Sequence, residues 1–214
     1  MSNYVIVDFE MCSVPKGEKR ERYKWRNEII QIGAVLVNEE LKIVDSFSSF
    51  VKPQFGVIDG FIEKLTGIKK ADTENAPIFC DALDEFIGWI PEGAVPVAWS
   101  NNDEKQIRRE CEEKGIENPR LSELLEVWTD CQVMFGDKMD CGKCYKLTDA
   151  LSIAGIVYDE GIHNALVDAK NTAELFIKMK KEPKLILSSY YATEEDVKSS
   201  GFTPFADLLA KYLA

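Results

Sequence analysis

Short apolar runs separated by turn residues occupy the first quarter of the chain and predict β-strands. The runs cover residues 4–7, 29–37 and 43–51, and the first of them ends at Asp8. Residues 38–40 read Asn-Glu-Glu, which fits a hairpin turn between the second and third runs. Three strands in succession indicate an antiparallel meander at the start of the fold.

Helical spacing of apolar residues dominates the rest of the chain, with two further strands between the helices. Phe79, Leu83 and Phe86, for example, fall on one face of a helix. The pattern predicts helices over residues 59–65, 78–89, 103–114, 147–154 and 165–181 and strands over residues 94–99 and 123–128. Because helices follow the fourth and fifth strands, we expect an α/β fold with a five-stranded mixed sheet, three antiparallel strands and then two parallel ones, flanked by helices.

The length of 214 residues suits one sizeable domain, which we place at residues 1–183. No apolar run approaches the roughly 20 residues that span a bilayer, so we expect no membrane contact. Residues 1–10 lack the basic and apolar regions of a secretory signal, and we expect a cytoplasmic protein. The net charge of −11 argues against holding duplex DNA by broad phosphate neutralisation. A carboxylate-rich nuclease stays compatible with this charge, because its cations meet the phosphate.

Residues 184–214 form an appended C-terminal tail. Thr193 resembles a helix N-terminal cap, and apolar residues follow at helical spacing. These apolar residues are Phe205, Leu208, Leu209 and Tyr212. We expect the tail to be helical and packed on the domain, since apolar stripes usually face their own core. The alternative is that the tail joins two copies of the chain as a homodimer or contacts another partner.

The chain has six cysteines, which we expect to be reduced thiols inside a cell. Cys141 and Cys144 have the CxxC spacing of half a zinc site, for which Cys131 and one further ligand would have to supply the rest. A single CxxC is a weak motif, so zinc binding there stays open.

Three carboxylates stand where predicted strands end. Asp8 and Glu10 are two residues apart on one strand, so both side chains point to the same face. Side by side they repel, and they are stable together only if a cation lies between them or one takes a proton. Asp103 follows the fourth strand where a helix begins, a junction at which sites form in α/β sheets. A helix N-terminal cap is the plainer interpretation of Asp103.

His163 is the only histidine of the chain, and Asp168 follows it by five residues. Five helical residues rotate by roughly 140°, so the two side chains converge only if His163 lies in the loop before the helix, as Gly161 permits. Asp168 falls on the apolar stripe that contains Ala169 and Phe176. A carboxylate on a buried stripe needs a partner.

Together these residues resemble the motif of the DEDDh exonucleases, a branch of the RNase H-like superfamily. The five matching residues are Asp8, Glu10, Asp103, His163 and Asp168. Their order and spacing agree over residues 4–181, with further similarity at residues 28–34, 65–68 and 147–151. The opening motif and the longer insertion after it look most like the histone-mRNA and small-RNA 3′ exonuclease branch. The alternative is the proofreading branch, whose substrate is DNA.

The resemblance implies a 3′–5′ exonuclease that releases nucleoside 5′-monophosphates from the 3′ ends of single-stranded nucleic acid, with RNA favoured over DNA. It implies two Mg²⁺ or Mn²⁺ ions about 4 Å apart, which stabilise the attacking and leaving oxygens. Asp8 would bridge the ions, Glu10 and Asp168 would complete the first, and Asp103 would reach the second through water. His163 would deprotonate the attacking water, because its pKa lies near working pH.

A basic segment follows the first motif, with six basic side chains among residues 16–26. The residues expected to contact phosphates or stack on a base are Lys19, Arg20, Arg22, Tyr23 and Trp25. A solvated charged loop with an aromatic anchor beneath it is the equal alternative. In the family, residues just after the first motif line the terminal-nucleotide pocket, which adds Met11 and Cys12, although a Met after a strand is more often core.

Two other functions stay open. A catalytically silent RNase H-like module would bind nucleic acid without turnover, although the five motif residues are all present. A structural or regulatory protein would act through the C-terminal tail. Mg²⁺-dependent release of mononucleotides distinguishes the exonuclease from both.

Overall fold

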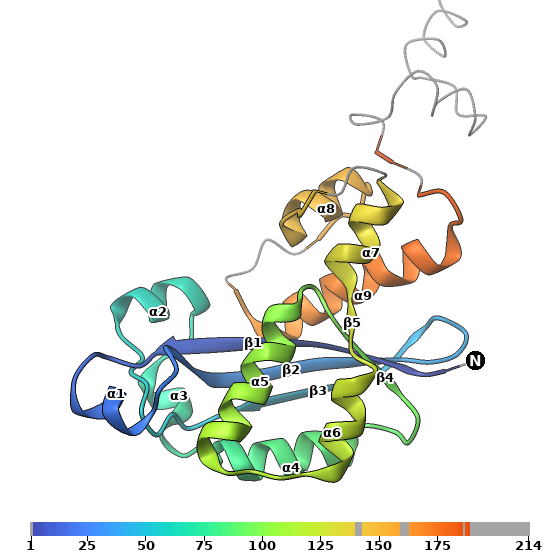
Figure 1. Ribbon diagram of the computed structural model, residues 1–214. Coiled ribbons are helices and arrows are strands. Elements are labelled where there is room, and N and C mark those ends of the chain that lie inside the picture. The colour runs from blue at the N-terminus through green and yellow to red at the C-terminus, as the bar shows by residue number, and fades with distance from the viewer. Residues whose placement is uncertain (1, 140–142, 159–162, 186, 189–214) are drawn as a thin grey trace, which may run out of the picture.

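The described part of the chain contains one mixed sheet with helices on both faces (Figure 1). A computed structural model describes residues 2–139, 143–158, 163–185 and 187–188. The strands are β1 (Tyr4–Ser13), β2 (Asn27–Val37), β3 (Ile43–Phe50), β4 (Val95–Ala98) and β5 (Thr129–Asp130). They lie in the order β3-β2-β1-β4-β5, with the first three antiparallel and β4 and β5 parallel to β1. This arrangement confirms the predicted α/β fold.

Helices form two layers that sandwich the sheet (Figure 1). Their bounds are α1 Glu18–Arg22, α2 Gly60–Thr66, α3 Lys70–Glu74, α4 Phe79–Trp89, α5 Asn101–Lys114, α6 Pro119–Glu126, α7 Cys131–Lys138, α8 Leu147–Ile153 and α9 Ala165–Lys181. One apolar cluster joins the sheet to α4, α5 and α6, and a second joins it to α7, α8 and α9. Short α1, α3 and α7 were not predicted, since five to eight residues carry too little periodicity to identify a helix.

Side chains of β1 alternate between these two layers. Val5, Val7 and Phe9 are buried in the cluster of α4, α5 and α6, whereas Ile6 is buried in the cluster of α7, α8 and α9. Successive side chains of a strand point to opposite faces, so Asp8 and Glu10 share the face of Ile6. Both carboxylates therefore point toward the layer that contains α9.

The first strand is longer than predicted. β1 continues five residues beyond Asp8 because β2 pairs with it as far as Ser13 and Asn27, with a register irregularity between Glu10 and Met11. Asp8 and Glu10 thus lie within the strand, not at its end. The charged residues did not stop the strand, because backbone pairing continues through them.

The strand predicted over residues 123–128 is wrong. This segment lies mostly in α6, where the Asn118 side chain accepts a hydrogen bond from Leu121 N–H and Pro119 occupies the first turn. Leu121, Leu124 and Leu125 are buried at helical spacing. The fifth strand follows as the two residues of β5, too short for an apolar alternation to reveal it.

The predictions for the C-terminal tail lie outside the described residues beyond Ser188. Up to that point the chain runs against α8: Leu185 is buried and Ser188 N–H donates to Ile153 O at 2.8 Å. No helix in the described ranges is long and apolar enough to cross a membrane. The domain boundary, the homodimer and the cytoplasmic location stay predictions.

The zinc hypothesis loses support from Cys131. Its side chain is fully buried in the apolar cluster under α7, and burial raises the pKa of its thiol, which disfavours the thiolate that zinc requires. Cys144 is exposed, and Cys141 lies outside the described residues.

Candidate active site

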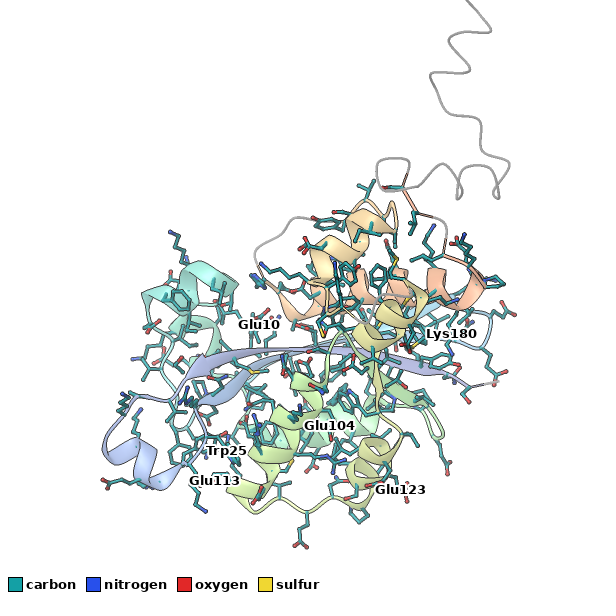
Figure 2. All side chains as sticks on the ribbon, turned by 45° about the horizontal axis from the view of Figure 1, so that its top comes forward. Glu10, Trp25, Glu104, Glu113, Glu123 and Lys180 are labelled. Carbon is teal, nitrogen blue, oxygen red and sulfur yellow. The ribbon has the colours of Figure 1, made fainter. Side chains whose placement is uncertain are left out.

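The two carboxylates of β1 form the base of the candidate site. Glu10 is buried and lies on the α9 side of the sheet (Figure 2). Asp8 is partly buried and, two residues earlier on the same strand, points to the same face. Burial raises the pKa of Asp8 well above its usual range, and the carboxylates of Asp103, Asp168 and Glu10 raise it further. Burial likewise raises the pKa of Glu10 to about 8, with Asp168 and Asp103 adding to the shift. Four acidic side chains therefore share one electrostatic environment.

Asp103 comes to this group from the first turn of α5. The helix begins two residues earlier than predicted, and Ser100, whose Oγ accepts from Asn102 N–H, is the N-terminal cap in place of Asp103. Asp103 is buried and its Oδ1 accepts a hydrogen bond from Phe9 N–H at 3.3 Å, between the two carboxylates of β1. Burial raises the pKa of Asp103 to about 7 against the opposing effect of that hydrogen bond.

Asp168 and His163 approach from the N-terminal end of α9. Nδ1 of His163 lies 3.8 Å from Oδ2 of Asp168, and the imidazole is 65% exposed. Glu10, His163 and Asp168 each offer a ligand atom within 4.8 Å of the others. Burial raises the pKa of Asp168, while His163 and Asn171 lower it. His163 precedes α9, as convergence with Asp168 requires, whereas Gly161 lies outside the described residues.

Contacts between α9 and β2 set the position of Asp168. Gln31 is buried opposite Glu10 in the strand pairing, and its Oε1 accepts a hydrogen bond from Ala165 N–H at 3.1 Å. A Cβ added to Gly33 would overlap the backbone of Ala165. Neither Gln31 nor Gly33 was predicted as a site residue from the sequence. The pattern that could have identified them is an amide and a glycine within the otherwise apolar run of β2.

Asp130 is a further carboxylate that the sequence analysis missed. Its Oδ2 accepts from Asn101 N–H at 3.1 Å in α5, and its Oδ1 accepts from Val133 N–H at 3.0 Å in α7. The same carboxylate adds to the raised pKa of Asp103. Asp130 thus caps α7 and also holds the first residue of α5, the helix that bears Asp103. An Asp directly before a predicted helix would have been the signal, but α7 was not predicted.

Two of the expected nucleotide contacts are contradicted. Tyr23 is fully buried, with its ring stacked on Phe55 and its hydroxyl donating to Asn27 O at 3.0 Å, so no face is left for a base. Cys12 is buried in an apolar cluster with Ile30, and burial raises the pKa of its thiol to about 12.

The other expected contacts differ in exposure. Met11 is partly buried against the core, which agrees with the plainer interpretation of that residue. One face of Trp25 lies under the guanidinium of Arg109, 4.8 Å from the ring centroid, beside α5 (Figure 2). Lys19 and Arg22 are exposed on α1, the helix that also contains Arg20.

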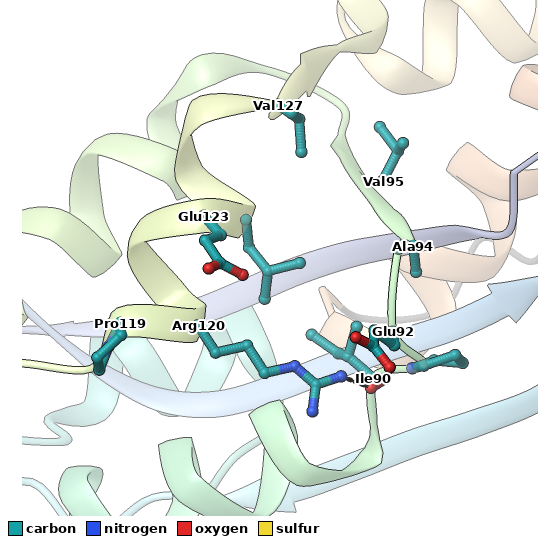
Figure 3. A pocket seen from close by; sticks show the side chains of 11 residues that line it. Ile90, Glu92, Ala94, Val95, Pro119, Arg120, Glu123 and Val127 are labelled. Carbon is teal, nitrogen blue, oxygen red and sulfur yellow. Dashed lines mark hydrogen bonds between the residues drawn. The ribbon is translucent and has the colours of Figure 1, made fainter.

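A separate pocket of about 650 Å³ lies between α6 and the segment that leads into β4 (Figure 3). It is lined by Ala94 and Val95, where β4 begins, whereas Asp103 follows the end of β4. Across it Arg120 donates a hydrogen bond to Ile90 O. This pocket is therefore not part of the candidate active site.

The donor set of the carboxylate site suits hard divalent cations. Mg²⁺ and Mn²⁺ prefer carboxylate oxygens. Burial raises the pKa of all four acids, and neighbouring carboxylates add to the shift at Asp8, Glu10 and Asp103, so a bound cation would offset both effects. The site has the arrangement that the DEDDh resemblance implies, with acidic residues on β1, α5 and α9 and a histidine beside the last of them.

Comparison with known proteins agrees with this class. The chain matches the exonuclease family (RNase_T) over residues 5–176 and belongs to it. A PolC-type DNA polymerase III from Caldanaerobacter subterraneus is 40% identical over 156 residues, covering 72% of this chain and 10% of the polymerase. ERI1 exoribonuclease 2 from Danio rerio is 31% identical over 202 residues, covering 82% of this chain and 34% of that protein.

A solved structure shares the fold. The nuclease domain of 3′hExo, a DEDDh family member bound to rAMP, superimposes with a TM-score of 0.73 at 23% identity, covering 88% of this chain and 96% of that domain. The chain therefore spans a tenth to a third of the two sequence relatives above and nearly the whole of this nuclease domain. The DEDDh resemblance and the fold class are confirmed.

Proposed function

We propose that this chain is a 3′–5′ exonuclease that hydrolyses single-stranded nucleic acid and releases nucleoside 5′-monophosphates. The observation that carries the proposal is the convergence of four acidic side chains from β1, α5 and α9, with His163 at 3.8 Å from Asp168. The family of the chain and the exonuclease names of its relatives support the same reaction.

The four carboxylates would hold two divalent cations, Mg²⁺ or Mn²⁺. They are Asp8, Glu10, Asp103 and Asp168. When bound, the cations supply positive charge to the attacking and leaving oxygens of the phosphodiester. Four ionised carboxylates contribute a charge of −4, so two divalent ions would leave the site neutral. Asp103 is further fixed by Phe9 N–H, and such fixed ligands lower the cost of assembling the site.

His163 would act as the general base. Its Nδ1 is directed at Asp168, which leaves Nε2 available to take the proton of the attacking water. The exposure of the imidazole keeps it close to solvent, from which that water comes. The nearness of His163 to Glu10 and Asp168 is also compatible with a ligand role. Loss of metal affinity in His163→Ala would favour the ligand role over the base.

RNA is the substrate we favour over DNA. A relative that covers 82% of this chain is named an exoribonuclease, and the 3′hExo domain was crystallised with a ribonucleotide. The PolC-type DNA polymerase, at 40% identity, is the observation that favours the alternative, a proofreading-type exonuclease acting on DNA.

A degradation assay with matched RNA and DNA oligomers, each with a free or a blocked 3′ end, tests the proposal. We expect Mg²⁺-dependent release of mononucleotides from free 3′ ends, abolished by chelator and by Glu10→Gln, with RNA degraded faster. Binding without turnover would instead identify a silent RNase H-like module. Neither binding nor turnover would favour a structural or regulatory role.

A further inference from the structure

A second cavity, of about 460 Å³, lies between α1 and the loop after β3. It is lined by two basic side chains, an amide and an aromatic ring. These residues are Lys19, Arg22, Gln54 and Phe55. We call it the α1 cavity. Both of its walls adjoin the end of β1, since Ser13 pairs with Val57 and Val14 N–H donates to Arg26 O at 2.7 Å.

The loop that forms one wall is held by a buried carboxylate. Glu28, at 0% exposure, accepts hydrogen bonds from three successive backbone N–H groups, those of residues 54, 55 and 56, at 2.9, 2.8 and 2.6 Å. Lys114 Nζ pairs with the same carboxylate at 2.8 Å. Gly56 lies so close to Cys12 that an added Cβ would overlap its Sγ. A buried charge with this many partners fixes the loop in one conformation.

This loop presents the ring of Phe55 beside the cations of α1. One face of the ring stacks on buried Tyr23, with centroids 5.1 Å apart, so the core supports it from behind. The guanidinium of Arg22 lies over the Phe55 ring, 5.8 Å from its centroid, so Arg22 would have to turn toward a phosphate before a base could take its place. Lys19 is exposed on the same helix. Cations that can neutralise phosphates next to an aromatic ring that can stack are the usual elements of single-strand binding.

Charge and position both favour the nucleic-acid strand as the ligand. Residues 16–26 carry six basic and two acidic side chains, in a chain whose net charge is −11. From Glu10 to Ser13 the backbone rises by roughly 10 Å, and α1 follows that end of β1, so the α1 cavity lies beyond the strand end and outside the candidate active site. A strand whose 3′ end occupies that site could reach the cavity with an upstream nucleotide.

We propose that the α1 cavity is a second subsite, which binds the strand several nucleotides upstream of the 3′ end. Lys19 and Arg22 contact backbone phosphates, and Phe55 stacks on a base or packs against a sugar. The subsite reads no sequence, because phosphates and aromatic stacking do not distinguish bases. This inference rests on the proposed function, since it assumes that a 3′ end occupies the carboxylate site.

The test measures KM for a series of single-stranded oligomers of increasing length. In the unmodified protein, KM should fall sharply once the oligomer is long enough to reach the α1 cavity. In the double variant Lys19→Ala/Arg22→Ala this fall should disappear. The slope of log KM against log salt concentration should also decrease by roughly 1.4, the value for two phosphate contacts on a single strand. Phe55→Leu should raise KM for long oligomers only.

A matched control removes two exposed lysines elsewhere, Lys42→Ala/Lys181→Ala. It should keep the length dependence, because Lys42 lies in the β2–β3 turn and Lys181 at the end of α9. A double variant Lys19→Ala/Arg22→Ala with unchanged KM on long oligomers overturns the subsite. If the unmodified protein degrades no oligomer, the proposed function fails separately. In that case, fluorescence anisotropy measures the affinity of a long oligomer for the double variant and for the parent. Equal affinities again overturn the subsite.

Discussion

At the scale of single residues, Gly33 determines how closely α9 approaches β2. The helix N-terminus lies directly on the Gly33 backbone, and Gln31, two residues earlier, accepts from Ala165 N–H. Asp168 is three residues into the same helix, so any displacement of the helix moves its carboxylate away from Glu10. Catalytic geometry is sensitive at this level, since a shift of about 1 Å can cost roughly 10²-fold in rate.

We therefore predict that Gly33→Ala lowers turnover by roughly 10²-fold, because the added Cβ overlaps the Ala165 backbone and displaces α9. Single-turnover rates at saturating metal measure the effect. Gly88→Ala is the matched control, because a Cβ there meets nothing within 4 Å. Gly88 also lies inside α4, where alanine is favoured over glycine, so this variant should be active and at least as stable as the parent. Equal turnover in the two variants would show that the α9 contact does not position the site.

The proposed base gives a second prediction at this scale. His163→Ala should lower turnover by roughly 10²- to 10⁴-fold, the usual contribution of a general base. Metal affinity, measured by calorimetric titration, should stay within a few-fold of the parent, because the carboxylates are the assigned ligands. Turnover equal to that of the parent would contradict the assignment.

The five motif residues could be proposed from the sequence because their order and spacing resemble the DEDDh motif, whereas Asp103 alone would be taken for a helix cap among polar neighbours. Gln31 and Asp130 could not, because their contribution is a hydrogen bond to a different element, and no spacing along the chain encodes that partner. The predicted base contact of Tyr23 was wrong because the sequence pattern does not show that this side chain is buried. An aromatic side chain among basic residues suggests stacking on a base, but the energy of burying its ring placed it in the core.

At the scale of elements, the long periodic helices and the three-stranded meander were predictable, whereas short elements were not. The end of α6 was mistaken for a strand because residues 123–128 are a short segment rich in apolar side chains, and only the Asn118 cap and Pro119 mark a helix start. β5 contributes two residues and is defined by its neighbours, β4 and the start of α7. Such elements depend on tertiary contacts that a local pattern does not contain.

Asp130 links these elements, and its removal should affect both stability and activity. Asp130→Ala removes the N-terminal cap of α7, at a cost of roughly 0.5–2 kcal/mol in the free energy of unfolding. It also removes the acceptor of Asn101 N–H in α5, although Ser100 still caps that helix. Because α5 carries Asp103, turnover should fall as well. Denaturant unfolding and steady-state kinetics measure the two effects.

Asn118→Ala is the control for this prediction. Asn118 caps only α6, which lies away from the carboxylates, so this variant should lose a comparable single-cap stability with turnover nearly unchanged. An Asp130→Ala protein that is destabilised but fully active would restrict Asp130 to a purely structural role.

At the scale of the whole molecule, the fold brings together carboxylates that repel each other when ionised, so bound protons or cations must offset their charge. The protein carries a net charge of −11, and four of its carboxylates meet in one partly buried place. Glu110 adds a further buried acid, whose pKa burial also raises, in the cluster with Glu28 and Lys114. Without cations, part of the stability of the folded state must therefore depend on protons.

This dependence gives a prediction with a definite sign. In the metal-free protein, burial and neighbouring carboxylates raise the pKa of Glu10 to about 8 and that of Asp103 to about 7, above their ordinary values of 4.5 and 3.8. The folded state then binds more protons than the unfolded state between about pH 4 and pH 8, so the free energy of unfolding should fall as pH rises through this window. The loss continues through pH 8, where Glu10 is about half ionised.

Divalent cations should reverse that loss, because they bind the ionised carboxylates that the unfolded chain does not assemble. Mg²⁺ should thus raise the Tm more at the alkaline end of the window than at the acidic end, where protons compete for the same oxygens. Thermal unfolding followed by circular dichroism, with Mg²⁺ or with chelator, measures both trends. The variant Glu10→Gln/Asp103→Asn removes two of the four site acids. Its stability should fall less steeply with pH, because among the described carboxylates only Asp8, Asp168 and Glu110 keep a raised pKa, and it should lose most of the Mg²⁺ effect. A metal-free parent that is more stable at pH 8 than at pH 5 would contradict the shared charge of the four carboxylates, since ionisation of Glu10 near pH 8 must then cost nothing.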